Sequence, residues 1–137
     1  MRGAAHHNTE VNEKFIADLL RARARLISNP PAIKLEKTIP YRQGFALTVP
    51  NTSGIYLFHD LRGVFYVGQS CDLRRRFDEH FWEKDNPLLA RALNNFVGEV
   101  YFSFVKVNAL EMNSSERQLI HDFYPLCNRI LYLSSNN

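Results

Sequence analysis

The sequence contains no long apolar segment and very little cysteine. None of its apolar runs approaches the roughly 20 residues that a membrane-spanning helix needs, and its N-terminus lacks the apolar core and small-residue cleavage site of a secretory signal. Its two cysteines, Cys71 and Cys127, form neither a CxxC pair nor another zinc-binding spacing. We therefore expect a cytoplasmic protein with free thiols, without a disulfide framework and without a membrane partner.

The composition is that of an ordinary globular domain. The chain has 137 residues, of which 45% are hydrophobic and 23% charged, and this length is sufficient to bury a core. The net charge of +3 is unevenly distributed. Residues 1–76 carry twelve Lys or Arg against six Asp or Glu, whereas residues 77–137 carry five against eight. A basic N-terminal half suits a polyanion such as nucleic acid, because phosphate contacts dominate the affinity for it.

The N-terminal third predicts one helix followed by an extended arm. Apolar residues recur there at steps of three and four, which predicts an amphipathic helix over residues 10–27: Val11, Phe15, Leu19, Ala22 and Leu26. Three arginines on this helix, Arg21, Arg23 and Arg25, are either solvated or in contact with DNA. Residues 28–44 contain three prolines and predict an extended connector. We expect residues 1–50 to belong to the same domain as the rest of the chain.

The remaining sequence alternates short strands and helices. Strands are predicted over residues 45–49, 54–59, 64–67 and 99–107, and helices over 71–83, 86–96 and 108–124. Asn86 followed by Pro87 is a typical helix start, and Pro125 ends the last helix. We predict an α+β fold with a small three-stranded, mainly antiparallel sheet packed among helices.

Two of these helices carry polar residues beside their apolar faces. Glu116 shares a face with Leu119, Ile120 and other apolar residues, and an isolated carboxylate there costs several kcal/mol unless it is paired or holds a cation. A buried ion pair with an arginine and a metal site are therefore both open. In the 71–83 segment, Arg76 and His80 lie one turn apart. All three residues are candidates for a polar cluster.

Two tyrosines occupy related positions in the predicted hairpin. Tyr56 and Tyr66 are ten residues apart, and glycines (Gly54 and Gly68) lie near them and permit a close backbone approach. Strand pairing can bring the two rings side by side on one face of the sheet. From the residues alone, packing is the commoner role of such a pair, and chemistry is the alternative.

These features together resemble the GIY-YIG nuclease family. The match extends over residues 52–131 and consists of six pieces in order: Gly54-Ile55-Tyr56, Tyr66-Val67-Gly68, Arg76 at the end of an Arg-rich segment, His80, Glu116 and Asn128. The spacing between the two tyrosines is the one usual in the family. Gln69 departs from the pattern, because the DNA-repair branch usually has a lysine there. The resemblance implies a nuclease domain over residues 51–137.

The resemblance also implies roles for these residues in a metal-dependent DNA endonuclease. Glu116 would bind Mg²⁺, with Mn²⁺ as an alternative, and Arg76 would neutralise charge on the phosphate. Tyr56 would orient the attacking water or take its proton, with support from Tyr66 and His80, and Asn128 would fix the loop. The expected products carry a 5′-phosphate and a 3′-hydroxyl. Nucleic-acid contacts are expected from Gln69, Arg74 and Arg75.

Other interpretations remain open at this stage. A catalytically idle GIY-YIG module that only binds nucleic acid is one alternative, and a nuclease acting on RNA is another. The N-terminal helix could supply a homodimer interface, but its packing onto the same chain, as a monomer, is favoured. The sequence does not indicate a target sequence.

Overall fold

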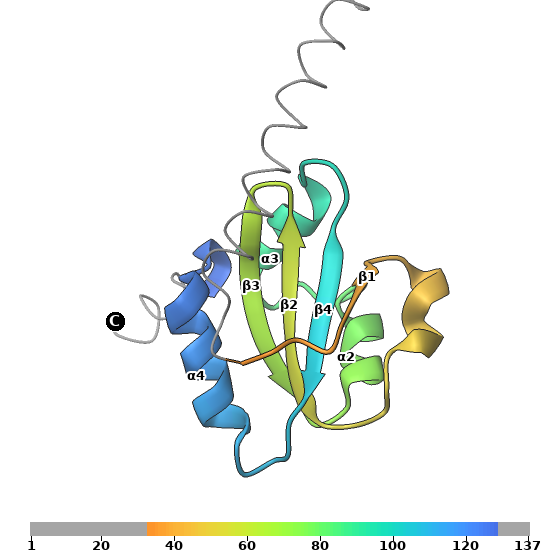
Figure 1. The fold of residues 1–137 in the computed structure, drawn as a ribbon. Helices are drawn as coiled ribbons and strands as arrows, with labels where there is room; N and C mark the ends of the chain where they lie inside the picture. Colours follow the sequence, from red (N-terminus) through yellow and green to blue (C-terminus); the bar gives the residue numbers. More distant parts are fainter. Residues whose placement is uncertain (1–32, 129–137) are drawn as a thin grey trace, which may run out of the picture.

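The computed structural model describes residues 33–128, which form a four-stranded antiparallel sheet with helices on both faces (Figure 1). The strands are β1 (Lys37–Pro40), β2 (Gly54–Asp60), β3 (Gly63–Ser70) and β4 (Tyr101–Lys106), in the order β1-β4-β2-β3. The helices are α2 (Leu73–Glu79), α3 (Pro87–Asn94) and α4 (Met112–Phe123), with a 3₁₀ helix, η1 (Gln43–Thr48), after β1. The predicted N-terminal helix lies outside the described residues.

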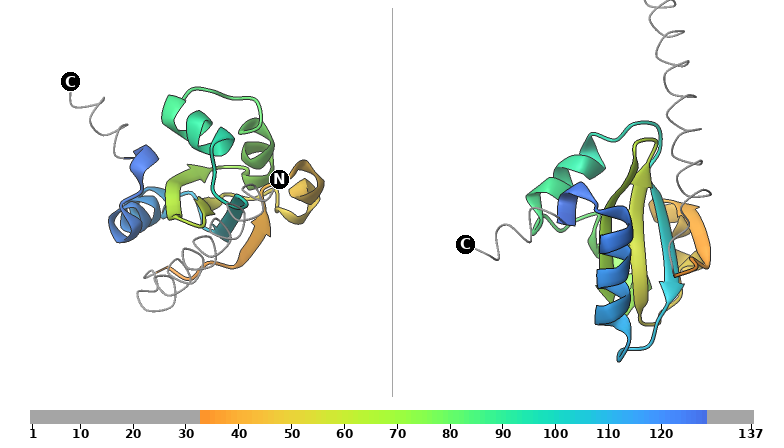
Figure 2. Two further views of the ribbon diagram at one scale, coloured as in Figure 1. Left: turned by 90° about the horizontal axis from the view of Figure 1, so that it is seen from above. Right: turned by 60° about the vertical axis from the view of Figure 1, so that its left-hand side comes forward.

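The central strand β2 explains the layered arrangement. Successive side chains of a strand point to opposite faces, so Ile55 and Leu57 pack with Leu119 of α4, whereas Tyr56 and Phe58 pack on the other side. That second side is covered by α2 and α3, and the two helical layers are visible on either side of the sheet in Figure 2. Every β2 residue except His59 is buried, as expected for a strand covered on both faces.

The predicted three-stranded sheet is wrong, because the arm supplies a fourth strand. Residues 37–40 pair with β4 in antiparallel register, from Lys37 opposite Phe104 to Pro40 opposite Tyr101. The prolines suggested a connector, but β1 is an edge strand that pairs on one side only, and Pro40 lies at its end. Proline is tolerated at such a position, since its missing N–H is not needed for the ladder.

The strand predicted over residues 45–49 is also wrong, because this segment forms η1. The alternation of the sequence suggested a strand, yet Leu47 is 80% exposed while Val49 is fully buried. In a 3₁₀ helix, residues three apart lie on one side, and Ala46 and Val49 are the side chains that reach the core. Arg74 donates hydrogen bonds to the carbonyls of Val49 and Leu47 and so ties η1 to α2.

The other elements agree with the sequence within a few residues. Asn86 caps α3 by accepting a hydrogen bond from Leu89 N at 3.1 Å, as its position before Pro87 predicted. Cys71 and Cys127 are both free. Among the described residues, no helix has the length and apolar character required to cross a bilayer.

Candidate active site

Four of the six predicted catalytic residues meet at the β3 side of the sheet, on the face covered by α2 and α3. Tyr66 lies opposite Phe58 in the β2–β3 ladder, two pairs away from Tyr56 and on the same face of the sheet. The two tyrosine rings have centroids 6.1 Å apart, and the ring of His80 lies 5.4 Å from Tyr56 and 6.0 Å from Tyr66. Arg76 directs its Nε to the hydroxyl of Tyr56 at 3.4 Å.

Gly68 permits this arrangement because the Tyr56 ring lies directly over it. The two residues are opposite each other in the register of β2 and β3. A Cβ atom at Gly68 would overlap Cζ and Oη of Tyr56. The second glycine of the sequence motif is therefore a steric requirement for the position of the Tyr56 hydroxyl.

The Tyr56 hydroxyl is buried and hydrogen-bonded. Its oxygen lies 2.6 Å from Nε2 of His80, and the residue is 1% exposed. Since a guanidinium can only donate, Tyr56 Oη accepts a hydrogen bond from Arg76 Nε, and it shares a further hydrogen bond with His80 Nε2. Burial, more than the neighbouring Tyr66, raises the pKa of Tyr56 well above its ordinary value, and the adjacent Arg76 does not offset this. Tyr56 is therefore a neutral phenol in this arrangement.

His80 is also neutral. Burial, together with the positive charge of Arg76, lowers its pKa to about 3. Of the Tyr56–His80 pair, only His80 also lines the neighbouring cleft.

This titration predicts an acid-sensitive stability. An unfolded histidine binds a proton below pH ~6.5, whereas His80 does so only near pH 3. Between these values the unfolded state binds more protons, so the free energy of unfolding should fall with falling pH by about 1.4 kcal/mol per pH unit. Urea unfolding at pH 7 and pH 5 measures this loss, and His80→Gln should reduce it. His121→Gln, at a side chain that is 85% exposed, is the control; equal pH dependence in all three proteins would contradict the assignment.

The cleft has a volume of about 170 Å³ and is lined by Tyr66, Arg76 and His80 together with two residues that the sequence analysis missed, Glu83 and Asp85. Arg76 Nη1 forms ion pairs with Glu79 at 3.0 Å and with Glu83. Partial burial lowers the pKa of Arg76, but the contacts with Tyr56, Glu83 and Glu79 outweigh this effect and raise it. The signal for Glu79 was its spacing, three residues after Arg76 on the same helix, whereas Glu83 lies beyond the end of α2.

Glu116 lies on α4, on the other face of the sheet, but within electrostatic reach of the cleft. Burial is the main cause of the raised pKa of Tyr66; the charge of Arg76 opposes this effect, and that of Glu116 adds to it. Burial raises the pKa of Glu116 itself, and only its neighbour Arg117 opposes this. Within residues 33–128, no hydrogen bond or ion pair reaches its carboxylate, so the arginine pair that the sequence left open is not found there.

The partly buried carboxylate of Glu116 is suited to binding a divalent cation. No group of three or more His, Cys, Asp or Glu side chains suited to a metal occurs in the described part of the chain. Mg²⁺ does not need such a group, because it keeps several waters and is bound through one or two carboxylates. The Glu116 carboxylate, which is partly desolvated and has no hydrogen bond or ion pair within residues 33–128, meets that requirement.

Three of the remaining predicted residues serve the scaffold. Asn128 is buried, and its amide both accepts from Val67 N and donates to Val67 O at 2.8 Å, so it pairs with the edge strand β3 as another strand would. Gln69 donates to Asn113 at the start of α4. Arg74 holds η1, as described above. Their catalytic or nucleic-acid roles stay predictions.

Arg75 differs from its neighbour Arg74. Its side chain is 59% exposed and forms an ion pair with Glu79 at 3.1 Å. Its Nη2 also approaches Cys71 Sγ at 3.3 Å. It is thus the more accessible of the two cations predicted to contact nucleic acid.

The fold and the cleft define a small α+β domain with a polar site at one edge of its sheet, where Tyr66, Arg76 and His80 meet. No protein-family model matches the sequence, and no curated protein matches it. Solved structures do match. The GIY-YIG N-terminal endonuclease domain of UvrC from Thermotoga maritima, bound to its catalytic magnesium, aligns with a TM-score of 0.52 and 20% identity over 62% of this chain and 92% of that chain. A point mutant of that domain, bound to its catalytic divalent cation, aligns with the same TM-score and identity, over 62% and 91%.

The chain therefore has the GIY-YIG fold, which confirms the resemblance found in the sequence at the level of the fold. The confirmed features are the α+β class and the antiparallel sheet with helices; the number of strands is four.

Proposed function

We propose that this protein is a metal-dependent DNA endonuclease that hydrolyses phosphodiester bonds to 5′-phosphate and 3′-hydroxyl products. The observation that carries the proposal is the convergence of Tyr56, Tyr66, Arg76 and His80 at one cleft, which all but the buried Tyr56 line. The partly buried carboxylate of Glu116, which has no hydrogen bond or ion pair within residues 33–128, is nearby. An idle binding module would have no physical need for a partly desolvated Glu116, which costs stability unless it holds a cation.

The residues at the site would have different roles in the reaction. Glu116 would hold Mg²⁺ or Mn²⁺, which when bound supplies charge neutralisation on the phosphate and the leaving oxygen. Arg76 would leave its ion pairs with Glu79 and Glu83 and bind the phosphoryl oxygens, a task that suits the guanidinium fork. Tyr66 and His80 line the cleft and would contact the phosphate and the attacking water. Tyr56 would act through His80, because its buried hydroxyl is hydrogen-bonded to that ring.

Arg76→Ala should lower the turnover of DNA cleavage by a factor of about 10²–10³, because it removes a positive charge that stabilises charge developing in the transition state. DNA binding should change little. Single-turnover cleavage and a gel shift in chelator measure the two effects separately. Arg76→Lys keeps the positive charge but loses the forked guanidinium, so its turnover should lie between those of the wild type and Arg76→Ala. Equal losses of binding and turnover would instead assign Arg76 to ground-state binding.

Binding should depend steeply on salt, because the basic half of the chain is expected to release counterions from DNA. Arg74→Ala combined with Arg75→Ala should flatten the plot of log affinity against log salt by about one for each phosphate that the protein no longer neutralises. Arg75→Ala alone should also flatten this plot, and it leaves the hydrogen bonds between Arg74 and η1 intact. Lys37→Ala, on the opposite edge strand, is the control. Affinity that barely responds to salt would contradict a phosphate contact by this half.

Parallel substrates separate the proposal from its alternatives. Duplex DNA and single-stranded RNA are incubated with the protein and Mg²⁺, and the cut ends are tested for sealing by DNA ligase. Cleavage of DNA with ligatable ends is expected. Cleavage of RNA alone would favour the RNA nuclease, and binding without cleavage of either would favour the idle module.

A further inference from the structure

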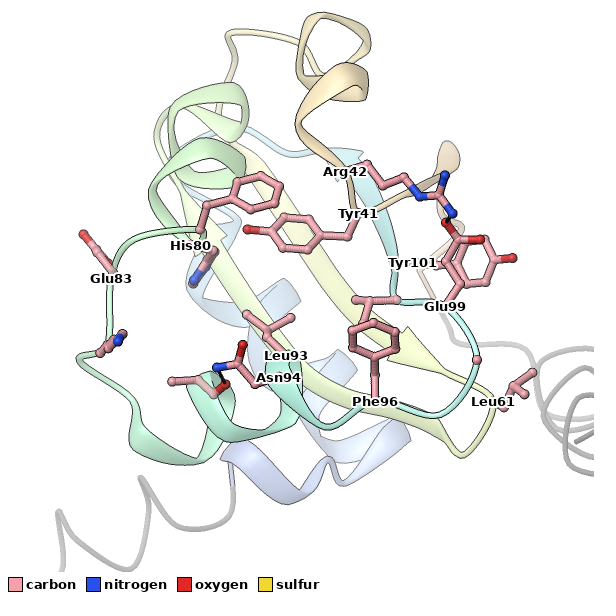
Figure 3. Close-up of a pocket in the computed structure, with 15 residues that line it drawn as sticks. Tyr41, Arg42, Leu61, His80, Glu83, Leu93, Asn94, Phe96, Glu99 and Tyr101 are labelled. Atoms are coloured by element: carbon pink, nitrogen blue, oxygen red, sulfur yellow. Dashed lines mark hydrogen bonds and ion pairs between the residues drawn. The ribbon is translucent and has the colours of Figure 1, made fainter. Parts of the chain in front are cut away.

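A second cavity, larger than the cleft, opens directly beside it. It has a volume of about 630 Å³ and is lined in part by His80, Glu83 and Ala90, all three of which also line the cleft. Figure 3 shows the labelled side chains around one opening, with Glu83 and His80 at one end and Glu99 and Tyr101 at the other. A group bound in the cleft therefore has this cavity as its immediate neighbour.

Four aromatic side chains line this cavity: Tyr41, Phe81, Phe96 and Tyr101. Tyr41 and Phe81 form a fixed wall, since their rings stack at 4.2 Å and the Tyr41 hydroxyl donates to Phe77 O. Phe96 also lines the cavity, yet it is 46% exposed and makes no ring contact within the part of the chain that the structure describes. An exposed aromatic ring inside a cavity is suited to stacking on a flat ligand.

The charges of the cavity do not favour a phosphate. Two cationic and two anionic side chains line it: Arg42, Lys84, Glu83 and Glu99. Arg42 is paired with Glu99 at 2.6 Å, and Glu83 is paired with Arg76 outside this cavity. The formal charges of these four lining side chains cancel, and polar groups such as Asn94 lie among the rings. This chemistry suits an uncharged, flat ring with a polar edge, and its volume is within the roughly 300–1,000 Å³ of ligand sites.

We infer that this cavity takes an unstacked nucleobase from the strand whose phosphate lies in the cleft. The inference rests on the proposed function, because it is the phosphate at Arg76 that brings a neighbouring base to the shared wall of His80 and Glu83. A base and its phosphate are parts of one nucleotide, so two adjoining sites of these two chemistries fit one strand. Stacking on Phe96 tolerates any base, and unpaired bases reach the cavity most readily.

A cycle of variants and probes tests the inference. The probes are a DNA duplex with one bulged adenine nucleotide and the same duplex with an abasic nucleotide at the bulge, both measured by fluorescence anisotropy in chelator. The full chain should bind the adenine probe about 5- to 150-fold more tightly. Phe96→Ala should lose this preference while its affinity for the abasic probe is unchanged. Phe96→Tyr should retain it, and so should the control Leu110→Ala, at a side chain that is 96% exposed.

The possible outcomes separate this inference from the function on which it rests. A Phe96→Ala protein that keeps the preference, or a wild-type protein without one, overturns the base site even if metal-dependent cleavage is normal. A wild-type protein that binds neither probe and cuts no DNA overturns both proposals. If Phe96→Ala does not fold, as judged by its melting temperature, Phe96→Leu repeats the test with an apolar side chain that cannot stack.

Discussion

Glu116→Gln should reduce DNA cleavage to the level that the wild-type protein shows in chelator. The change removes the negative charge and keeps the shape of the side chain, so the metal loses its charged oxygen ligand while the fold is preserved. Burial raises the pKa of Glu116, and an acid with a raised pKa in the native state destabilises that state when it is ionised. The free energy of unfolding in chelator should therefore not decrease.

The matched control is Glu111→Gln, which neutralises an exposed carboxylate at the start of the same helix. It should cleave at the wild-type rate. Addition of Mn²⁺ to Glu116→Gln should restore little activity, because the amide oxygen carries no charge. Full activity of Glu116→Gln in Mg²⁺ would contradict the assignment of this residue as the metal ligand.

Tyr56→Phe should lower turnover by a factor of about 10²–10⁴, the range for the loss of a group that handles a proton. The ring packing remains, but His80 Nε2 loses its only described partner within residues 33–128. Leaving this buried nitrogen without its partner should lower the free energy of unfolding by about 1–3 kcal/mol. The sequence could not predict this loss of stability, because it did not reveal the hydrogen bond.

The second tyrosine provides the comparison for this prediction. Tyr66→Phe removes a hydroxyl from a half-buried ring that lines the cleft. A nearly native rate for Tyr56→Phe with a severe loss for Tyr66→Phe would reverse the two roles. If both variants cleave at the native rate, the tyrosines serve packing, as is common for tyrosine pairs in strands. Single-turnover rates and urea unfolding of both variants decide between these outcomes.

The sequence predicted the elements whose local signals and tertiary packing agree. The β2–β3 hairpin, the Asn86 cap and the apolar face of α4 each follow from periodicity or from a local hydrogen bond. The segment over residues 37–49 was predicted wrongly, because long-range pairing decides it. β1 forms through its register with β4, more than sixty residues away, and η1 is held by Arg74 from α2.

For the candidate site, the sequence predicted which residues lie near one another better than it predicted the contacts between them. Motif spacing located Tyr56, Tyr66, Arg76 and His80, and the structure places them together. The protonation states could not be predicted, because they depend on burial, which raises the pKa of Tyr56 and lowers that of His80. The ion pair of Arg76 with Glu83 was missed for a related reason, since Glu83 lies beyond the end of α2, where helical spacing no longer defines neighbours.

The most direct test of the central claim is the rate at which purified protein converts supercoiled plasmid DNA to the open circular form as a function of Mg²⁺ concentration. We expect no conversion in chelator and a rate that rises and saturates with Mg²⁺. Conversion at the same rate in chelator would contradict a metal-dependent mechanism. Tight DNA binding with no conversion in Mg²⁺ or Mn²⁺ would show that the cleft of Tyr66, Arg76 and His80 does not perform catalysis.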